Sequence, residues 1–275
     1  MEIVNKIHSI LDYFFVPFQG IAPFWGMLVI SFVTGVLMVL VYKYTSNQSA
    51  IAGVKNRIKG HLLETWIYRE QVRVMLKAQK KVLLANLKYM FLNLKPLAFM
   101  LVPVLFILIN LNFRYGMKPL RTGESTIFIA ERLTAVPIEE MTEELISPPE
   151  VTVESPPVRV ESEGRTYWRI SANTPGRYAL KVKTAQGEYE KILEVGEFGE
   201  RRLSPRRTMK FWDNFFYPGE PRLPNDCPFV SMEIIYPSEH PRIPETNWHP
   251  HWIIQYFVLS IVFGFLVKGP LKVEI

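Results

Sequence analysis

Three blocks of apolar residues stand out against an otherwise polar chain, and they divide it into segments of different character. They cover residues 21–44, 97–114 and 248–268. A helix needs about 20 apolar residues to cross the core of a bilayer. The first block is long enough, the second is barely long enough, and the apolar part of the third, residues 252–267, is short. Tryptophan and tyrosine residues flank the first and third blocks, as they do at membrane–water interfaces. The pattern predicts a bundle of three transmembrane helices.

The segment between the first two blocks, residues 45–96, carries apolar residues at helical intervals, beginning with Ile51, Val54 and Ile58. A single helix of about 50 residues would carry the chain about 80 Å away from the membrane at 1.5 Å per residue. Both ends of the segment must return to the same membrane face. We therefore predict a hairpin of two antiparallel helices, a short coiled coil with its turn near residues 66–69. A helix break is expected before Pro96, because the residue preceding a proline avoids the helical conformation.

Residues 119–247 are predicted to form a β-rich domain. Residues 166–171 and 176–183 alternate apolar and polar side chains, and a Gln-Gly turn at 186–187 leads into a matching strand. Further strands are predicted at 151–153, 158–160 and 230–236. Trp168, followed by a Pro-Gly turn, resembles the core of immunoglobulin-like sandwiches, in which a tryptophan packs on the central strands. The expected fold class is thus α+β, a three-helix membrane bundle with an immunoglobulin-like β-sandwich.

Three smaller segments border the predicted membrane. Residues 1–20 have the spacing of an amphipathic helix, and their aromatic side chains favour a position in the membrane interface over packing on a soluble domain. The aromatic cluster at residues 211–217 leaves two interpretations open, packing on the β domain or contact with the membrane. Residues 269–275 form a short C-terminal tail.

The distribution of charge assigns these segments to opposite sides of the membrane. Residues 43–96 carry eleven Lys and Arg and two acids, a net charge of +9. Short basic loops stay on the cytoplasmic side. Residues 119–247 have a net charge of −5, so the total of +6 is not the signature of a nucleic-acid-binding protein. We expect a multi-pass inner-membrane protein with its N-terminus and β domain outside and its C-terminus in the cytoplasm.

A catalytic set is not visible in the sequence. It contains no phosphate-binding loop, no zinc-protease helix motif and no serine elbow, so we expect neither an enzyme nor a cofactor. His249 and His251 could ligate a metal ion, but no cysteine or carboxylate cluster accompanies them, which favours simple interfacial contact. Cys227 is the one cysteine and has no evident partner. A membrane enzyme is the third and least favoured interpretation.

Polar side chains inside the predicted spans are the candidate functional residues, because such residues are costly in lipid. The candidates for a groove that contacts a client are Lys43, Asn110, Asn112, Gln255 and Ser260. Snorkelling of Lys43 to the interface and helix–helix hydrogen bonds of the others are the competing interpretations. The candidates for contact with a cytoplasmic partner are the basic residues of the hairpin, Lys55, Arg57, Lys59, Arg69, Arg73, Lys77, Lys80 and Lys81.

The order of these elements resembles the YidC/Oxa/Alb superfamily of membrane-protein insertases, most closely its three-span archaeal branch. The residues that carry the resemblance are Val41-Tyr42-Lys43 before the hairpin, Gln79-Lys80-Lys81, Asn86-Leu87-Lys88-Tyr89-Met90, Leu94-Lys95-Pro96 and Pro103. The resemblance implies a hydrophilic groove open to the cytoplasm and to lipid, with Lys43 as its basic residue. It also implies that the hairpin contacts ribosomes or incoming substrate.

Two features depart from that family. The β domain lies between the second and third spans, and the additional pair of spans found in bacterial members is missing. The resemblance predicts an insertase or insertion chaperone whose partners are lipid, hydrophobic client proteins, a ribosome or targeting factor and membrane-protein subunits. The alternative is a membrane-anchored binding or scaffold protein whose outer β domain recognises a partner in the cell envelope.

Overall fold

A computed structural model describes residues 13, 15–18, 22–134, 136–196, 202–238, 241–246 and 248–274. The chain is an α+β protein that divides into two compact units. One unit comprises Met1–Gly26 and Leu108–Trp252, and the other comprises Met27–Ile107 and Ile253–Ile275. Most of the amphipathic helix predicted for residues 1–20 lies outside the described residues. The described part includes a short 3-10 turn, η1 (Val16–Phe18).

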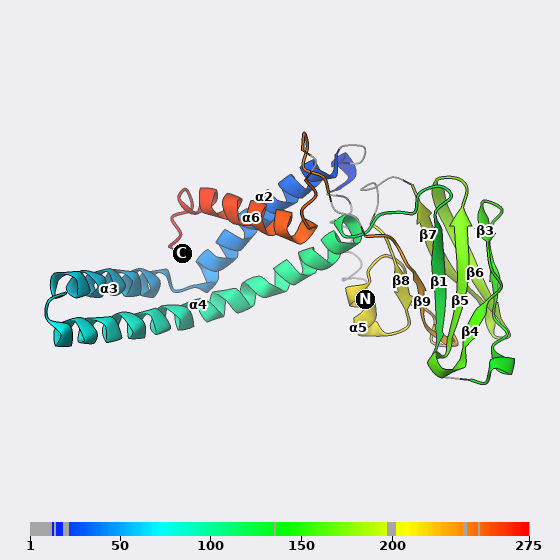
Figure 1. Cartoon of the computed structure of the whole chain (residues 1–275), viewed down its shortest axis with the longest axis horizontal. Helices are drawn as coiled ribbons and strands as arrows, with labels where there is room; N and C mark the ends of the chain where they lie inside the picture. Colours follow the sequence, from blue (N-terminus) through cyan, green and yellow to red (C-terminus); the bar gives the residue numbers. More distant parts are fainter. Residues whose placement is uncertain are drawn as a thin grey trace. The chain divides into compact units, whose positions relative to one another are not determined.

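The described part of the chain contains four helices of 17 residues or more (Figure 1). They are α2 (Pro23–Thr45), α3 (Gln48–Ile67), α4 (Val72–Tyr115) and α6 (Trp252–Lys268). Among the described residues, α2 and α4 are long and apolar enough to cross a membrane, whereas α6 is a shorter apolar helix. The first and second apolar blocks of the sequence therefore lie in two candidate membrane-spanning helices, and the third forms a helix of 17 residues.

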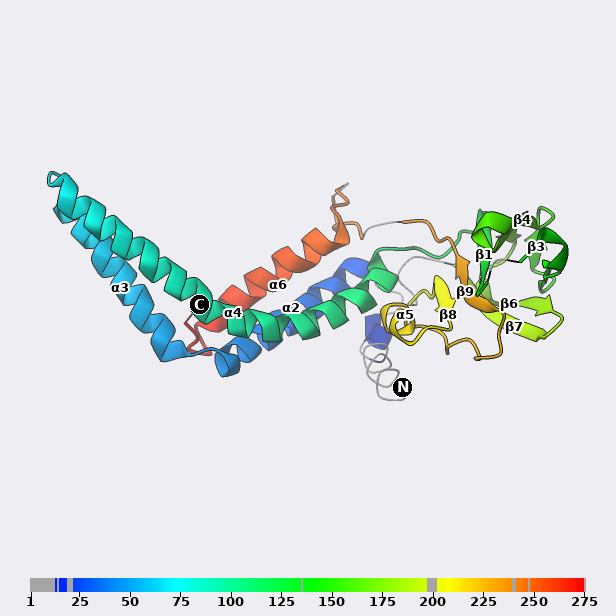
Figure 2. The same ribbon diagram turned by 90° about the horizontal axis from the view of Figure 1, so that it is seen from below.

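Helices α3 and α4 form the predicted hairpin, lying side by side in both views (Figures 1 and 2). The turn at residues 68–71 confirms the prediction of a turn near residues 66–69. Asn47 caps the start of α3, where its Oδ1 accepts the backbone N–H of Ala50 at 3.0 Å. Across the hairpin, the ammonium of Lys81 lies 3.0 Å from a carboxylate oxygen of Glu64.

The predicted helix break before Pro96 is wrong. Helix α4 continues for 44 residues and contains both Pro96 and Pro103. A proline inside a helix removes one hydrogen bond and bends the axis, but apolar helices tolerate this where the remaining backbone bonds are kept. Figure 2 shows α4 changing direction along its length. One continuous helix therefore joins the second arm of the hairpin to the second apolar block.

The β domain contains two antiparallel sheets in the described part of the chain (Figure 1). The six-stranded sheet has the order β3-β5-β1-β9-β8 with β4 paired to β5, and the three-stranded sheet has the order β2-β6-β7. The strands are β1 (Ser125–Arg132), β2 (Glu144–Ile146), β3 (Val151–Val153), β4 (Val158–Val160), β5 (Arg165–Ala172), β6 (Gly176–Thr184), β7 (Gly187–Val195), β8 (Arg206–Thr208) and β9 (Phe229–Ile234). A short helix, α5 (Phe211–Phe216), follows β8, and 3-10 turns lie at η2 (Ile138–Glu140) and η3 (Glu161–Glu163).

The predicted strands are confirmed, and three were missed. Strands β3 and β4 have the predicted bounds, β5 and β9 lie within two residues of theirs, and β6 and β7 form the predicted hairpin around Gly187. The missed strands are β1, β2 and β8. Trp168 lies in the core as expected, opposite Phe128 on β1 with their ring centroids 5.5 Å apart. Leu180 and Leu193 join the same buried cluster, so both sheets share one core.

Candidate functional site: an apolar groove among three helices

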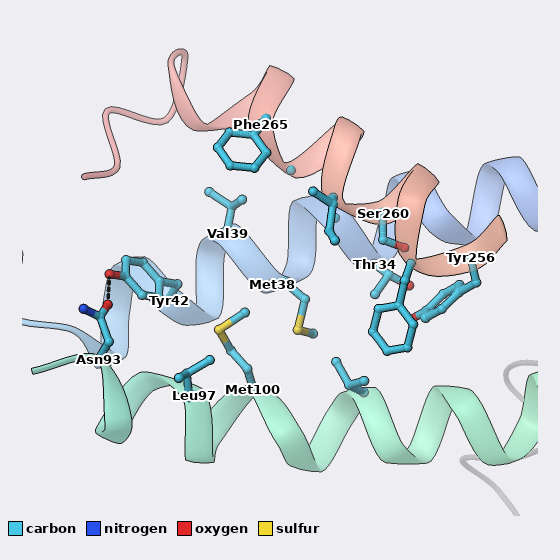
Figure 3. A pocket seen from close by; sticks show the side chains of 15 residues that line it. Thr34, Met38, Val39, Tyr42, Asn93, Leu97, Met100, Tyr256, Ser260 and Phe265 are labelled. Atoms are coloured by element: carbon cyan, nitrogen blue, oxygen red, sulfur yellow. Dashed lines mark hydrogen bonds between the residues drawn. The ribbon is translucent and has the colours of Figure 1, made fainter. Parts of the chain in front are cut away.

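Three helices of the second unit, α2, α4 and α6, line a partly open cavity of about 490 Å³ (Figure 3). Its lining residues are Thr34, Gly35, Met38, Val39 and Tyr42 from α2, Asn93, Leu97, Met100 and Val104 from α4, and Tyr256, Phe257, Ser260, Ile261, Gly264 and Phe265 from α6. Most of these side chains are apolar. The cavity is called the groove below.

Small residues allow α2 and α6 to approach each other beside the groove. A Cβ atom added to Gly35 would lie 2.8 Å from the backbone oxygen of Ser260 and 3.0 Å from the backbone nitrogen of Gly264. Such close approach between backbones is typical of helix pairs in membranes. Phe32 and Phe263 pack edge to face next to this contact, with their ring centroids 5.3 Å apart. Helix α4 lies on the opposite side of the cavity from α6 (Figure 3).

Polar groups of the groove are concentrated at its two ends. At one end the hydroxyl of Tyr42 donates a hydrogen bond to the Asn93 side chain, which ties α2 to α4. At the other end the hydroxyls of Thr34, Tyr256 and Ser260 point toward one another (Figure 3). Between these ends the lining is apolar. The groove is therefore an apolar surface with polar ends, rather than the hydrophilic groove that the family resemblance implies.

The methionines Met38 and Met100 project into the middle of the groove from facing helices (Figure 3). A thioether side chain has three rotatable bonds and a polarizable sulfur, so it can adapt to partners of different shape. Methionines on a binding surface therefore favour contact with varied apolar sequences. The sequence contains ten methionines, and periodicity alone did not distinguish the two that face the cavity.

Among the five predicted groove residues, the described structure places Ser260 in the lining. Lys43 lies at the end of α2, where its ammonium donates to the backbone oxygen of Leu271 at 3.0 Å. Gln255 is buried on α6 but is not a lining residue. The basic residue that the resemblance places in the groove thus instead holds the C-terminal tail.

Asn110 and Asn112 belong to the other unit, at the end of α4. Asn110 is buried, and its Oδ1 accepts a hydrogen bond from the guanidinium of Arg202 at 3.3 Å. The backbone oxygen of Asn112 accepts the N–H of Gly116 at the end of the helix. Asn110 therefore connects α4 to the loop before β8, a role that the sequence did not reveal.

The basic residues predicted to contact a partner lie mainly on the surface of the hairpin. Exposed in the structure are Arg57, Lys59, Arg69, Arg73, Lys77, Lys80 and Lys81. Lys55 is half-buried and forms an ion pair of 3.0 Å with Glu274 in the C-terminal tail. Hydrogen bonding to Lys55, together with its charge, lowers the pKa of the Glu274 carboxyl. The hairpin thus presents a cationic surface whose charges are largely accessible.

The C-terminal tail is the feature of this unit that sequence reasoning missed. The backbone N–H of Glu274 donates to the Gln48 side chain at 2.7 Å, and Val273 packs in a buried cluster with Tyr42 and Ile51. The tail therefore lies across the junction of α2 and α3. The available signal was Glu274 itself, an acid near the end of a chain whose hairpin is strongly basic.

The β domain contains a buried ion pair that was also missed. Lys191 occupies an inward-facing position on β7, and its ammonium contacts the Glu220 carboxylate and the backbone oxygen of Ser204. Burial lowers the pKa of Lys191, while the charge of Glu220 opposes that shift. The alternation of β7 could have predicted this burial, because Lys191 points to the same face of the strand as the buried Tyr189 and Leu193. Its surroundings make it part of the core.

The described residues contain no cluster of side chains suited to hold a metal ion. No three His, Cys, Asp or Glu side chains gather there at metal-binding distance. His249 and His251 are both exposed, and His251 stacks on Trp252. Burial raises the pKa of the Cys227 thiol to about 11, so at neutral pH it is the unreactive protonated form. The groove and the hairpin surface are the features that remain to be explained.

Comparison with known proteins does not assign the chain to a family. No protein-family model matches it, and neither a curated protein nor a solved structure matches it. The resemblance to the insertase superfamily therefore rests on the order of elements and the residues quoted above. The groove and the basic residues of the neighbouring hairpin are the structural features that bear on function.

Proposed function

We propose that the chain is a membrane-protein insertase or insertion chaperone of the YidC-like type. In this proposal α2, α4 and α6 cross the inner membrane as a three-span bundle, with the hairpin in the cytoplasm and the β domain, an immunoglobulin-like sandwich, outside. The observation that carries it is the apolar groove of about 490 Å³, lined by all three apolar helices and polar at both ends.

The size of the groove suits side chains rather than a whole helix. Its volume lies within the range of about 300–1,000 Å³ that is common for ligand sites. An α-helix with its side chains is about 10–12 Å wide, so a client helix would lie along the open side and insert one face. Each Å² of apolar client surface that leaves water for the groove or the lipid would contribute about 25 cal/mol. Burial of the client's own apolar segment then drives insertion, and no nucleotide is required.

Two further features would reduce the barrier for a polar flank of the client. The polar ends of the groove, Tyr42 with Asn93 and Ser260 with its neighbours, offer hydrogen-bond partners, whereas an unsatisfied polar group in hydrocarbon costs several kcal/mol. Helix α6 has 17 residues and is about 25 Å long, shorter than a bilayer core of about 30 Å. A short span thins the bilayer locally, which shortens the path of a polar segment.

The hairpin would supply the cytoplasmic partner surface. Its net charge of +9 over residues 43–96 attracts anionic partners such as a ribosome or a targeting factor and raises their rate of encounter. The exposed positions extend from Arg57 to Lys81. Because α4 is one continuous helix, a partner bound to the hairpin would be held next to the groove formed by that helix.

The test compares two faces of α4 in proteoliposomes during insertion of an apolar client. A photo-cross-linking residue at Met100 faces the groove, and one at Val102, which is 71% exposed, is the matched control. We expect client adducts at 100 and few at 102. In parallel, Met100→Trp should fill the groove and slow insertion, while Val102→Trp should not. Equal adducts at both positions, or equal insertion rates of the two variants, would refute the proposal.

A second candidate function, an anchored binding protein, is favoured by a hollow of about 400 Å³ on the β domain. Its lining includes Ser125, Tyr167 and Arg169, a mixed polar surface suited to a peptide or protein partner. Deletion of residues 125–245 separates the two functions. If insertion persists without the domain, the bundle is the active part. If the bundle inserts nothing and partner capture depends on the domain, the binding function replaces the first proposal.

A further inference from the structure

The short helix α5 exposes an aromatic edge. Phe211 is 48%, Trp212 71% and Phe216 52% exposed. Trp212 and Phe216 are four residues apart and so lie on the same face of the helix. Such large apolar side chains are costly to leave in water, and an aromatic group of this kind is typical of a protein or membrane contact. The aromatic edge is therefore a candidate contact surface.

The position of α5 within its own unit indicates what this surface contacts. The segment leading to α5 is fastened to the end of the apolar helix α4 by two hydrogen bonds, from Leu203 N–H to the Phe113 backbone oxygen at 2.8 Å and from Arg202 to Asn110 at 3.3 Å. At the other end of α5, the ring centroids of Tyr217 and Phe113 are 5.8 Å apart. Figures 1 and 2 both show α5 beside the end of α4.

The contacts also fix the depth of α5 along the axis of α4. They reach from Asn110 to Phe113, within the last six residues of a helix that ends at Tyr115. The five residue steps from Asn110 to Tyr115 correspond to about 7.5 Å. The apolar run of α4 ends there and is followed by Arg114 and Lys118, so in the proposed membrane placement the bilayer surface lies at this level. Interfacial helices insert about 5–10 Å into the boundary between headgroups and acyl chains, which is the same depth.

We propose that α5 is a lipid-interface anchor, with its aromatic edge inserted into the headgroup layer of the bilayer that α4 crosses. Trp212 and Phe216 lie at the boundary between headgroups and acyl chains, and the exposed Lys210 at the start of the helix contacts lipid phosphates. The anchor holds the six-stranded sheet of the β domain against the membrane through its strand β8, which precedes α5 directly. The inference rests on the membrane placement of α4 in the proposed function.

The test measures membrane depth in the full chain, reconstituted in vesicles of phosphatidylethanolamine and phosphatidylglycerol. Spin labels are attached to Trp212→Cys and Phe216→Cys, and their collision rates with oxygen and with a water-soluble nickel complex are compared. Val158→Cys, at an exposed site on β4, is the aqueous control, and Leu105→Cys, at an exposed site on α4, is the hydrocarbon control. The native Cys227 is buried, so the unmodified chain shows the background labelling.

The expected result is a depth of about 5–10 Å below the phosphates for labels at 212 and 216, between the two controls. If the label at 105 reports hydrocarbon while those at 212 and 216 report water, the anchor is overturned and the membrane placement of α4 stands. Labels at 212 and 216 shielded from both oxygen and nickel would instead show a protein partner and also overturn it. If the label at 105 reports water, the proposed function fails together with the anchor.

Discussion

The contact of Gly35 with α6 offers the sharpest test of the helix bundle. In a Gly35→Ala variant the new Cβ would lie 2.8 Å from the Ser260 oxygen, 3.0 Å from the Gly264 nitrogen and 3.2 Å from the Phe263 Cβ. Favourable contacts begin near about 3.5 Å, so α6 must retreat by about 0.5–0.7 Å. Two of the three atoms belong to the backbone and cannot rotate away. The strain therefore has to be relieved by moving the whole helix.

The expected magnitude follows from that displacement. A gap of about 0.5–1 Å forfeits a quarter to a half of each dispersion contact along the interface, and overpacked cores lose about 1–3 kcal/mol. We expect Gly35→Ala to lower the free energy of unfolding by an amount in the upper half of this range, about 2–3 kcal/mol. Gly53→Ala and Gly60→Ala in α3 are the matched controls, because no atom lies within 4 Å of their added Cβ. Because both glycines lie inside a helix, replacing either by alanine should stabilise the protein by about 0.5–1 kcal/mol.

The assay is reversible unfolding by SDS in mixed micelles, followed by the circular dichroism of the helices. Gly35→Ala should lower the SDS mole fraction at which half of the protein is unfolded, whereas both control variants should leave that midpoint unchanged or raise it. A Gly35→Ala protein as stable as Gly53→Ala would refute the close packing of α2 on α6. The groove would then have no defined wall on that side.

Three further predictions concern the β domain. Burial opposes ionisation of Glu143, but hydrogen bonds and the charge of Arg132 outweigh burial and lower the pKa of the Glu143 carboxyl. The ionised carboxylate therefore contributes to stability above pH 4.5, and this contribution is lost as the pH falls through the lowered pKa. Glu143→Gln should cost about 3–5 kcal/mol in unfolding at neutral pH and flatten that acid dependence; an unchanged profile would contradict it. Glu220→Gln should destabilise the domain by a similar amount, about 3–5 kcal/mol, because it leaves the buried Lys191 ammonium without its counter-charge. In a double-mutant cycle, adding Lys191→Met should recover most of that loss of stability. Additive losses from the two substitutions would disprove the coupling. Cys227, buried and with its pKa raised to about 11, should resist maleimide until the domain unfolds, and rapid labelling of the native protein would show that the core is open there.

The sequence predicted those parts of the fold that depend on local patterns. The hairpin of β6 and β7 follows from alternation around a turn in which Gly187 adopts φ of +152°, a conformation open to glycine. The turn between α3 and α4 was predicted from the requirement that both ends of the basic segment return to one face of a membrane. Strand β1 was missed because residues 127–130 are four consecutive apolar residues, so the alternation of its buried side chains is not visible in the sequence.

The failures share a physical cause, which is that tertiary contacts overrode local preference. Pro96 is a helix breaker in isolation, yet it lies inside α4. Lys43 fitted the expected intramembrane cation, but its hydrogen-bond partner Leu271 is 228 residues away in the chain. For the candidate site, the apolar runs predicted which helices exist. The faces that meet, and hence the role of Met38 and Met100, depend on packing that periodicity does not encode.

Both candidate functions require the hairpin and the β domain to lie on opposite sides of a membrane, and thiol labelling tests this most directly. Glu70→Cys in the hairpin turn and Ala185→Cys in the turn between β6 and β7 are both exposed sites, and native Cys227 is buried. In intact cells a membrane-impermeant maleimide should label position 185 and should reach position 70 only after permeabilisation. Labelling of both positions from the same side would contradict the crossing of the membrane by α4, and with it the proposed groove.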